Sequence, residues 1–278
     1  MSTSTMPPAP AGAVPPDQRE IRVYSHSTLF YWWPVWAVGF IMAILTLLDG
    51  HRMAIVPSGT IAEANRKVEG HDPADVLIAP KGKALPRDEN NEIIQPSRHM
   101  ANSPRYGVVY ATILIMTIVV SSVPLRGLWS LIIVLCIVLL VVIIALFGMW
   151  DPILEKLNLL DIRINMGGYL FISLILLLIW ALTVFIFDHR IYVTVTPGQV
   201  RVCQAVGAGE TVYDTTGMTF TKQQNDLFRH WIIGLGSGDL IIHRSNTNQE
   251  IDMPNVLFIA AKVREIEQLI KERKVTVS

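Results

Sequence analysis

The chain has 278 residues, of which 51% are hydrophobic and 17% are charged, and its 23 basic side chains balance its 23 acidic ones. This is richer in apolar residues than an ordinary soluble protein, and the neutral balance excludes the basic surface that nucleic-acid binding requires. Two cysteines, Cys136 and Cys203, are too few for a disulfide framework, and we expect both to be small apolar side chains and no cofactor to be bound.

The N-terminal residues are rich in Pro, Ala, Ser and Thr and carry no charge before Asp17. A secretory signal peptide has a basic start followed by an apolar stretch, and this segment has neither. We therefore expect residues 1–28 to form a disordered tail.

Four long blocks without Asp, Glu, Lys, Arg or His come next along the chain. Each is long enough to cross about 30 Å of hydrocarbon as a helix. Aromatic rings crowd the start of the first block, and because such rings prefer the headgroup level we expect Trp32, Trp33 and Trp36 to be interfacial anchors. The predicted transmembrane helices are 29–48, 107–124, 128–150 and 167–187.

Residues 49–106 form a long connection between the first two predicted spans. A helix-like stretch, TIAEANRKVE (60–69), and a strand-like one, VLIAP (76–80), are set among Pro, Gly, Asn and charged residues. Large apolar residues are too few for a sizeable core, so a partly ordered loop is expected. His51, His71 and His99 are separated by distances that match no compact ligand spacing, and no metal site is expected from them.

Residues 151–166 place apolar side chains along one helical stripe, with acids and bases opposite. This pattern predicts a short helix lying in the membrane interface. The alternative is a helical extension of the third span that bends at Pro152.

After residue 187 the hydrophobic period changes to two, which predicts strands separated by turns rich in Gly, Pro and Asn. A helix should follow, with Asn255 as its N-cap and Ile259, Val263, Ile266 and Ile270 on one apolar face. The predicted strands are 190–196, 199–204, 210–214, 218–224, 227–233, 239–244 and 250–253.

Three glycines, Gly234, Gly236 and Gly238, raise the question of a nucleotide-binding loop. Their spacing is Gly-x-Gly-x-Gly, and the residues that follow have no helical period, so both the spacing and the context of a dinucleotide fingerprint are missing. We predict instead a tight structural turn between the strands 227–233 and 239–244, where glycine permits positive φ.

The order of these elements, together with the run RHWIIGLGSGDLII (229–242), resembles the bacterial pleckstrin-homology-like domains of membrane proteins. The resemblance covers residues 188–278 and implies a small antiparallel β domain that acts as a binding or assembly module. Family members that hold phosphoinositides use Lys and Arg around the first hairpin. Here Arg201 is the one base near that turn, so protein contact, self-association included, is the expectation.

The predicted fold class is a membrane protein with four transmembrane α-helices followed by a small antiparallel β domain with a C-terminal helix. We expect a non-enzymatic protein of the inner (plasma) membrane, in contact with the lipid bilayer and with proteins, including its own copies, and with both termini in the cytoplasm. Two alternatives remain open. One is a component of a transport or channel assembly; the other is a membrane enzyme, for which Asp188-His189-Arg190 is the titratable cluster beside a span.

Overall fold

The computed structural model describes residues 19–68, 70, 72–122, 128–203, 209–244 and 250–276. The predicted tail up to residue 18, the link 123–127, His71 and the turns expected within 204–208 and 245–249 lie outside the described residues. The chain divides into two compact units. The first contains residues 1–36, 113–151 and 174–278, and the second contains residues 37–112 and 152–173.

Three helical segments are long and apolar enough to cross a membrane: Thr28–Leu48, Arg105–Ser122 and Met166–Arg190. In hydrocarbon a helix satisfies its backbone N–H and C=O groups within itself, which is why such apolar runs adopt this form. A fourth helix, α3, is also apolar, but its apolar part at 131–146 is shorter than these three segments. The elements are η2 (Thr28–Trp32), α1 (Trp33–Leu48), α2 (Arg105–Ser122), α3 (Leu128–Leu146), α5 (Met166–Leu182), η3 (Thr183–Phe187) and η4 (Asp188–Arg190).

The predicted amphipathic helix after α3 is present but short. It is α4 (Trp150–Asn158), and it ends well before the predicted limit at residue 166. Gly148 has a φ of 61° and follows the last turn of α3, so the chain leaves α3 in the left-handed conformation that commonly ends a helix. The helix α4 is therefore a separate element, and its position in a membrane interface stays a prediction.

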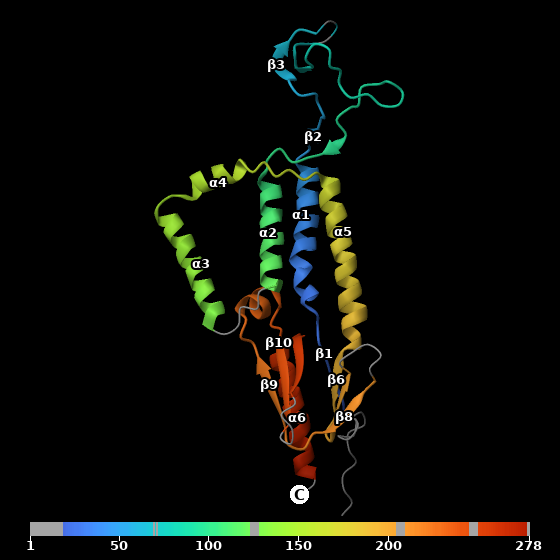
Figure 1. The fold of residues 1–278 in the computed structure, drawn as a ribbon, viewed down its shortest axis with the longest axis vertical. Coiled ribbons are helices and arrows are strands. Elements are labelled where there is room, and N and C mark those ends of the chain that lie inside the picture. Colours follow the sequence, from blue (N-terminus) through green and yellow to red (C-terminus); the bar gives the residue numbers. More distant parts are fainter. Residues whose placement is uncertain are drawn as a thin grey trace, which may run out of the picture. The chain divides into compact units, whose positions relative to one another are not determined.

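In the second unit, the connection 49–106 contains two small antiparallel pairs, one of which includes β3 (Figure 1). The helix predicted at 60–69 is wrong, because β3 pairs with β4 and Asn65 has a φ of 52°, which interrupts a helix. The strand predicted near 76–80 is confirmed as part of β4. The pairs are β2 (Arg52–Met53) with β5 (Arg98–His99), and β3 (Ile61–Arg66) with β4 (Ala74–Ile78).

The helices of the second unit pack through small residues and aromatic rings. The rings of Tyr110 and Tyr169 meet edge to face at 5.4 Å between centroids. A Cβ added to Gly39 would collide with the Ser173 side chain and would lie 3.0 Å from the Tyr110 ring. Glycine at this position therefore allows the close approach of helices that apolar membrane segments depend on.

The first unit holds the β domain, which has a four-stranded sheet in the order β1-β6-β7-β8 and a three-stranded sheet in the order β11-β10-β9. All pairings in both sheets are antiparallel. The chain then ends in a helix, α6, that contacts β9, β10 and β1. The bounds are β1 (Ile21–Tyr24), β6 (Tyr192–Val195), β7 (Gln199–Cys203), β8 (Thr211–Asp214), β9 (Met218–Gln223), β10 (Gly238–Arg244), β11 (Glu250–Val256) and α6 (Ile259–Thr276).

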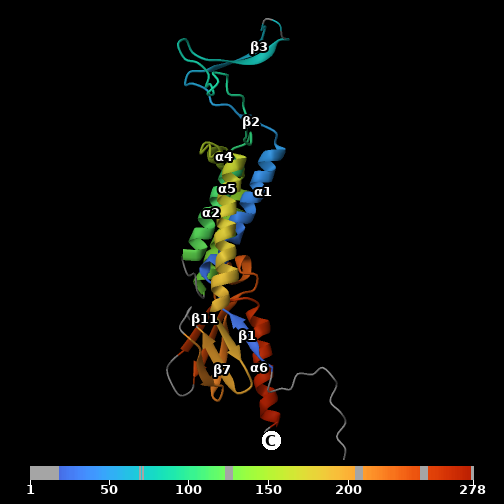
Figure 2. The ribbon, with the colours of Figure 1, turned by 90° about the vertical axis from the view of Figure 1, so that its right-hand side faces the viewer.

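One strand of this domain comes from the other end of the chain. β1 precedes the first apolar helix, yet it pairs with β6 in the register Ile21 with Val195 through Tyr24 with Tyr192 (Figure 1, Figure 2). The expectation of a disordered tail over all of residues 1–28 is therefore wrong from residue 21 onward. A four-residue strand with one buried side chain has little signal of its own and is fixed by its partner.

The strand predicted at 227–233 is also wrong, because these residues form a helical turn, η5 (Leu227–Ile233). The Asp226 side chain accepts a hydrogen bond from the Arg229 backbone N–H at 3.0 Å, which is the contact of a helix N-cap. Phe228, Arg229 and Ile233 are buried at helical spacing. Trp231 and Ile232 of the same segment are exposed, so its apolar side chains are divided between the buried and the exposed side of a helical turn, which the period-two reading missed.

The core of the β domain lies between the two sheets and α6. Alternate side chains of β6, β7, β10 and β11 point inward, as period-two strands require. Ile259, Val263 and Ile266 of α6 cover them, with Ile270 half-buried, so the predicted apolar face is confirmed. The predicted N-cap is not: Asn255 lies in β11 with a φ of 56°, and the helix begins at Ile259.

Candidate functional site

The β domain and the beginning of the first apolar helix are joined by a buried polar cluster, which we call the polar junction. It consists of His26, Tyr31, Asp188, Arg229, Ser237 and Asn255. These residues come from the segment after β1, from η2, from η4 and from the region between η5 and β11. All six are in the first unit and are almost fully buried.

Asn255 is the centre of the polar junction. Its Nδ2 donates to the His26 backbone O at 2.8 Å, and its Oδ1 accepts from Tyr31 Oη at 2.7 Å and from an Arg229 Nη at 2.9 Å. Its backbone N–H donates to Asp239 Oδ1 at 3.0 Å. Asparagine tolerates the left-handed conformation and offers both a donor and an acceptor, so the residue type fits the position.

Arg229 brings a positive charge into this buried region. Its guanidinium carbon lies 5.3 Å from the centroid of the Tyr31 ring, a cation–π distance. Asp226 and Asp239 are the nearby acids. Burial raises the pKa of the Asp239 carboxyl, but the facing His230 imidazole, the Asn255 N–H and the Arg229 charge outweigh burial, and the pKa lies below its ordinary value. These contacts favour the ionised form of Asp239, whose Oδ1 lies 3.7 Å from His230 Nε2.

A second link ties the end of the last apolar helix to the segment after β1. Asp188 Oδ2 lies 3.1 Å from His26 Nδ1 and accepts from the Ser27 backbone N–H, also at 3.1 Å. His189 turns elsewhere: its ring lies 4.7 Å from that of Tyr24, and its Nδ1 faces the Val184 backbone O at 3.3 Å. The sequence cluster 188–190 is therefore divided among different partners.

The three glycines occupy the turn between η5 and β10. Gly236 has a φ of 80°, and its N–H donates to the His230 backbone O at 2.8 Å. A Cβ on Gly234 would collide with the Arg229 backbone O, and a Cβ on Gly238 would lie 2.7 Å from the Ile259 side chain and 2.9 Å from the Gln223 backbone O. Each glycine is thus required by φ or by close approach.

The tryptophans at the start of the first apolar helix have different surroundings. Trp33 Nε1 donates to the Ile233 backbone O at 2.9 Å, and so connects α1 to η5. The Trp36 ring lies 5.5 Å from that of Trp180, whose Nε1 donates to the Phe30 backbone O at 3.0 Å. Trp32 is half-buried. The role of these three residues as membrane anchors stays a prediction, and Trp33 has in addition a structural contact with η5.

Sequence reasoning missed Tyr31, Arg229 and Asn255 as partners. The available signal was weak: a Pro-Asn pair at 254–255 directly after a strand pattern, and an arginine at 229 within a largely apolar run. Both are polar residues where a core is expected, which is the kind of residue that needs a buried partner.

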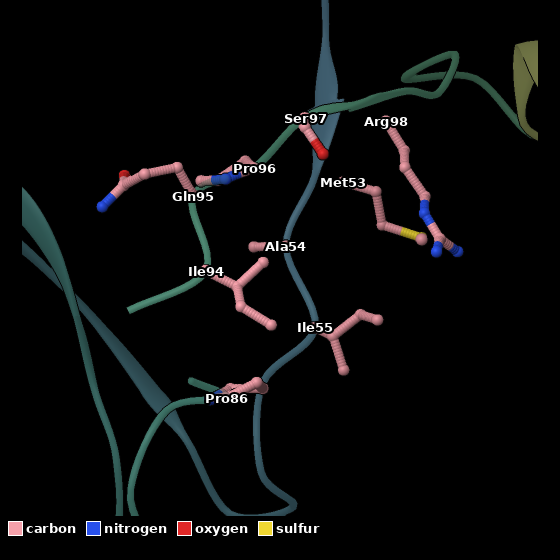
Figure 3. Close-up of a pocket in the computed structure, with 9 residues that line it drawn as sticks. All are labelled: Met53, Ala54, Ile55, Pro86, Ile94, Gln95, Pro96, Ser97 and Arg98. Carbon is pink, nitrogen blue, oxygen red and sulfur yellow. The ribbon is translucent and has the colours of Figure 1, made fainter. Parts of the chain in front are cut away.

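The second unit has a shallow hollow of its own, of about 160 Å³, between the segments 53–55 and 94–98. Figure 3 shows Ala54 and Ile94 facing each other across it, with Met53 and Arg98 on the far side of the strand. Over the described part of the chain, no group of three or more His, Cys, Asp or Glu side chains is placed to hold a metal ion.

No protein-family model, curated protein or solved structure matches the chain. The class that the described residues define is a protein with three helices able to span a membrane and an antiparallel β domain that carries a C-terminal helix.

Proposed function

We propose that this chain is a non-enzymatic protein of the plasma membrane that presents a pleckstrin-homology-like β domain for binding another protein or a second copy of itself. Two antiparallel sheets followed by a C-terminal helix support this choice of fold. In this domain the first strand, β1, is supplied by residues that precede the first span. The observation that carries the proposal is the polar junction, because it holds the β domain against the ends of the spans.

We infer four spans, with α3 as the third, and the pairing of β1 with β6 supports this number. The two strands exchange backbone hydrogen bonds, so residues 21–24 and 192–195 lie on one side of the membrane. The number of crossings between them is therefore even. Three long apolar helices alone would give an odd number, and the apolar α3 (Leu128–Leu146) supplies the remaining crossing. We assign the shared side to the cytoplasm.

A domain fixed in this way presents a fixed surface. Orientation that is set before binding lowers the entropy cost of association. The surface we assign to the partner is the outer edge of β8, with which no other described strand pairs. Val212 on this strand is 53% exposed. An open edge offers backbone N–H and C=O groups to an added strand.

The shared side can be tested with single cysteines. In a chain with Cys136→Ser and Cys203→Ser, one cysteine replaces Arg22 in β1 and, in a second chain, Gln199 in β7. We expect neither to react with a membrane-impermeant maleimide in intact cells and both to react after permeabilisation. Labelling of one but not the other in intact cells would contradict an even number of spans.

The binding edge can be tested by photo-cross-linking in native membranes. A photoreactive amino acid at Val212 should give a discrete cross-linked product, whereas the same group at Gln199, exposed on the neighbouring inner strand, should not. If the partner is a second copy of the chain, a copy that carries Val212→Lys should give no cross-linked product with the photoreactive copy. Equal products from both positions, or none from Val212, would contradict binding at β8.

A further inference from the structure

A groove of about 300 Å³ opens beside the last turn of the last apolar helix. Its walls come from three places: the strand β1 and the residues after it, the helix end at Val184–His189, and the turn between β11 and α6. All of them belong to the first unit. We propose that this groove binds an anionic phospholipid, with one acyl chain along its apolar wall and the phosphate at its cationic rim.

The wall of the groove suits an acyl chain. Val184, Phe185, Leu257 and Phe258 line it, and nearly all of its surface is apolar. Phe258 is 63% exposed and is held with a φ of 50°, an uncommon conformation for an aromatic residue. Burial of this ring against a ligand would recover the cost of exposing it to water.

The position of the groove indicates which apolar ligand reaches it. Phe185 belongs to Met166–Arg190, one of the helices able to span a membrane, and the residue is 61% exposed. Next to a helix that faces lipid, the local concentration of lipid is far higher than that of any soluble ligand. The occupant we commit to is therefore a bilayer phospholipid.

The rim of the groove indicates the headgroup. Arg22 and Lys262 both line it, and no Asp or Glu is present among its described lining residues. Arg22 pairs with Glu20 at 3.0 Å, and Lys262 pairs with Glu265 at 3.0 Å, but all four side chains are more than a third exposed. Exposed pairs of this kind contribute little, so a phosphate can take their place. Asp188 is buried, and its Oδ2 is already engaged by His26 Nδ1 and the Ser27 backbone N–H.

Native mass spectrometry of the full-length chain, released from detergent micelles, tests the proposal. The probes are palmitoyl-oleoyl phosphatidylglycerol and the phosphatidylcholine of the same chains. We expect one retained lipid and a clear preference for phosphatidylglycerol. Because each Lys or Arg near an anionic surface accounts for about a fivefold preference, Arg22→Gln with Lys262→Gln should lower the ratio by tenfold or more. Arg201→Gln with Lys222→Gln, two exposed cations outside the groove, should leave the ratio unchanged.

A second variant tests the acyl wall separately. Phe258→Asn removes the ring but keeps a residue that tolerates positive φ, so the thermal midpoint should not fall. Retention of both lipids should fall at least threefold. Equal retention of the two lipids by the wild-type chain would overturn the proposal. Unchanged lipid retention in Phe258→Asn would also overturn it, as would displacement of the lipid by millimolar glycerol phosphate. Either result would mean that the phosphate alone is recognised.

Discussion

Replacement of Asn255 by glycine is expected to destabilise the β domain strongly, although it removes only one small side chain. Three side-chain hydrogen bonds are lost, to His26, Tyr31 and Arg229. Two are between neutral groups, at about 1 kcal/mol each, and the one to the guanidinium is worth about 1.5–3 kcal/mol. The φ of 56° suits glycine, so little strain is added. The expected loss is about 3–5 kcal/mol, increased by the buried Arg229 charge left without its acceptor.

The assay is thermal or denaturant unfolding of the full-length chain in detergent micelles. Asn91→Gly is the matched control, because Asn91 also has positive φ, 63°, but is exposed. We expect the control to lie within about 0.5 kcal/mol of the wild type, as surface substitutions do. If Asn255→Gly lost less than about 1 kcal/mol, or no more than the control, the claim that the polar junction fixes the domain would be refuted.

Three further outcomes are expected from the same unfolding assay. Val23→Ala in β1 should cost about 2 kcal/mol, as much as Val193→Ala in β6, since both valines are buried in one core; a much smaller effect at Val23 would exclude β1 from it. Gly238→Ala should cost about 1–3 kcal/mol because its Cβ would press on Ile259, and a neutral result would show that the turn adapts. Because the pKa of Asp239 is lower in the folded protein than its ordinary value of 3.8, ionised Asp239 stabilises the fold at pH values above 3.8. This stabilisation is lost as the pH falls through the folded-state pKa. Unfolding measured from pH 6 to pH 3 should therefore show a loss below about pH 4 that Asp239→Asn lacks, and identical pH profiles would contradict the assignment.

The apolar helices and the C-terminal helix could be predicted because their signals are local. Long runs without charge are sufficient to define a candidate span, and Ile259, Val263 and Ile266 repeat at helical spacing. The turn at Gly234 to Gly238 was predicted for the same reason, although it follows a helical turn and not a strand. Each of these features depends on residues within a few positions of one another.

The errors share the opposite property, since their causes lie far along the chain. The residues of β1 become a strand because β6 pairs with them, and the segment 60–69 has helix-forming residues but becomes β3 by pairing with β4. Asn255 resembles an N-cap in sequence, and only the approach of Tyr31 and Arg229 gives its side chain another use. Tertiary partners decided these cases over local propensity.

The pairing of β1 with β6 also sets the order of events during synthesis. β1 leaves the ribosome first, and its partner follows only after every apolar helix has been made; His26 and Asp188, which close the same connection, are 162 residues apart. Long-range pairing of this kind is slow, because the intervening chain must be brought together before any contact stabilises it. The four-stranded sheet can therefore be completed only after the whole chain between β1 and β6 has been made and its two ends have been brought together.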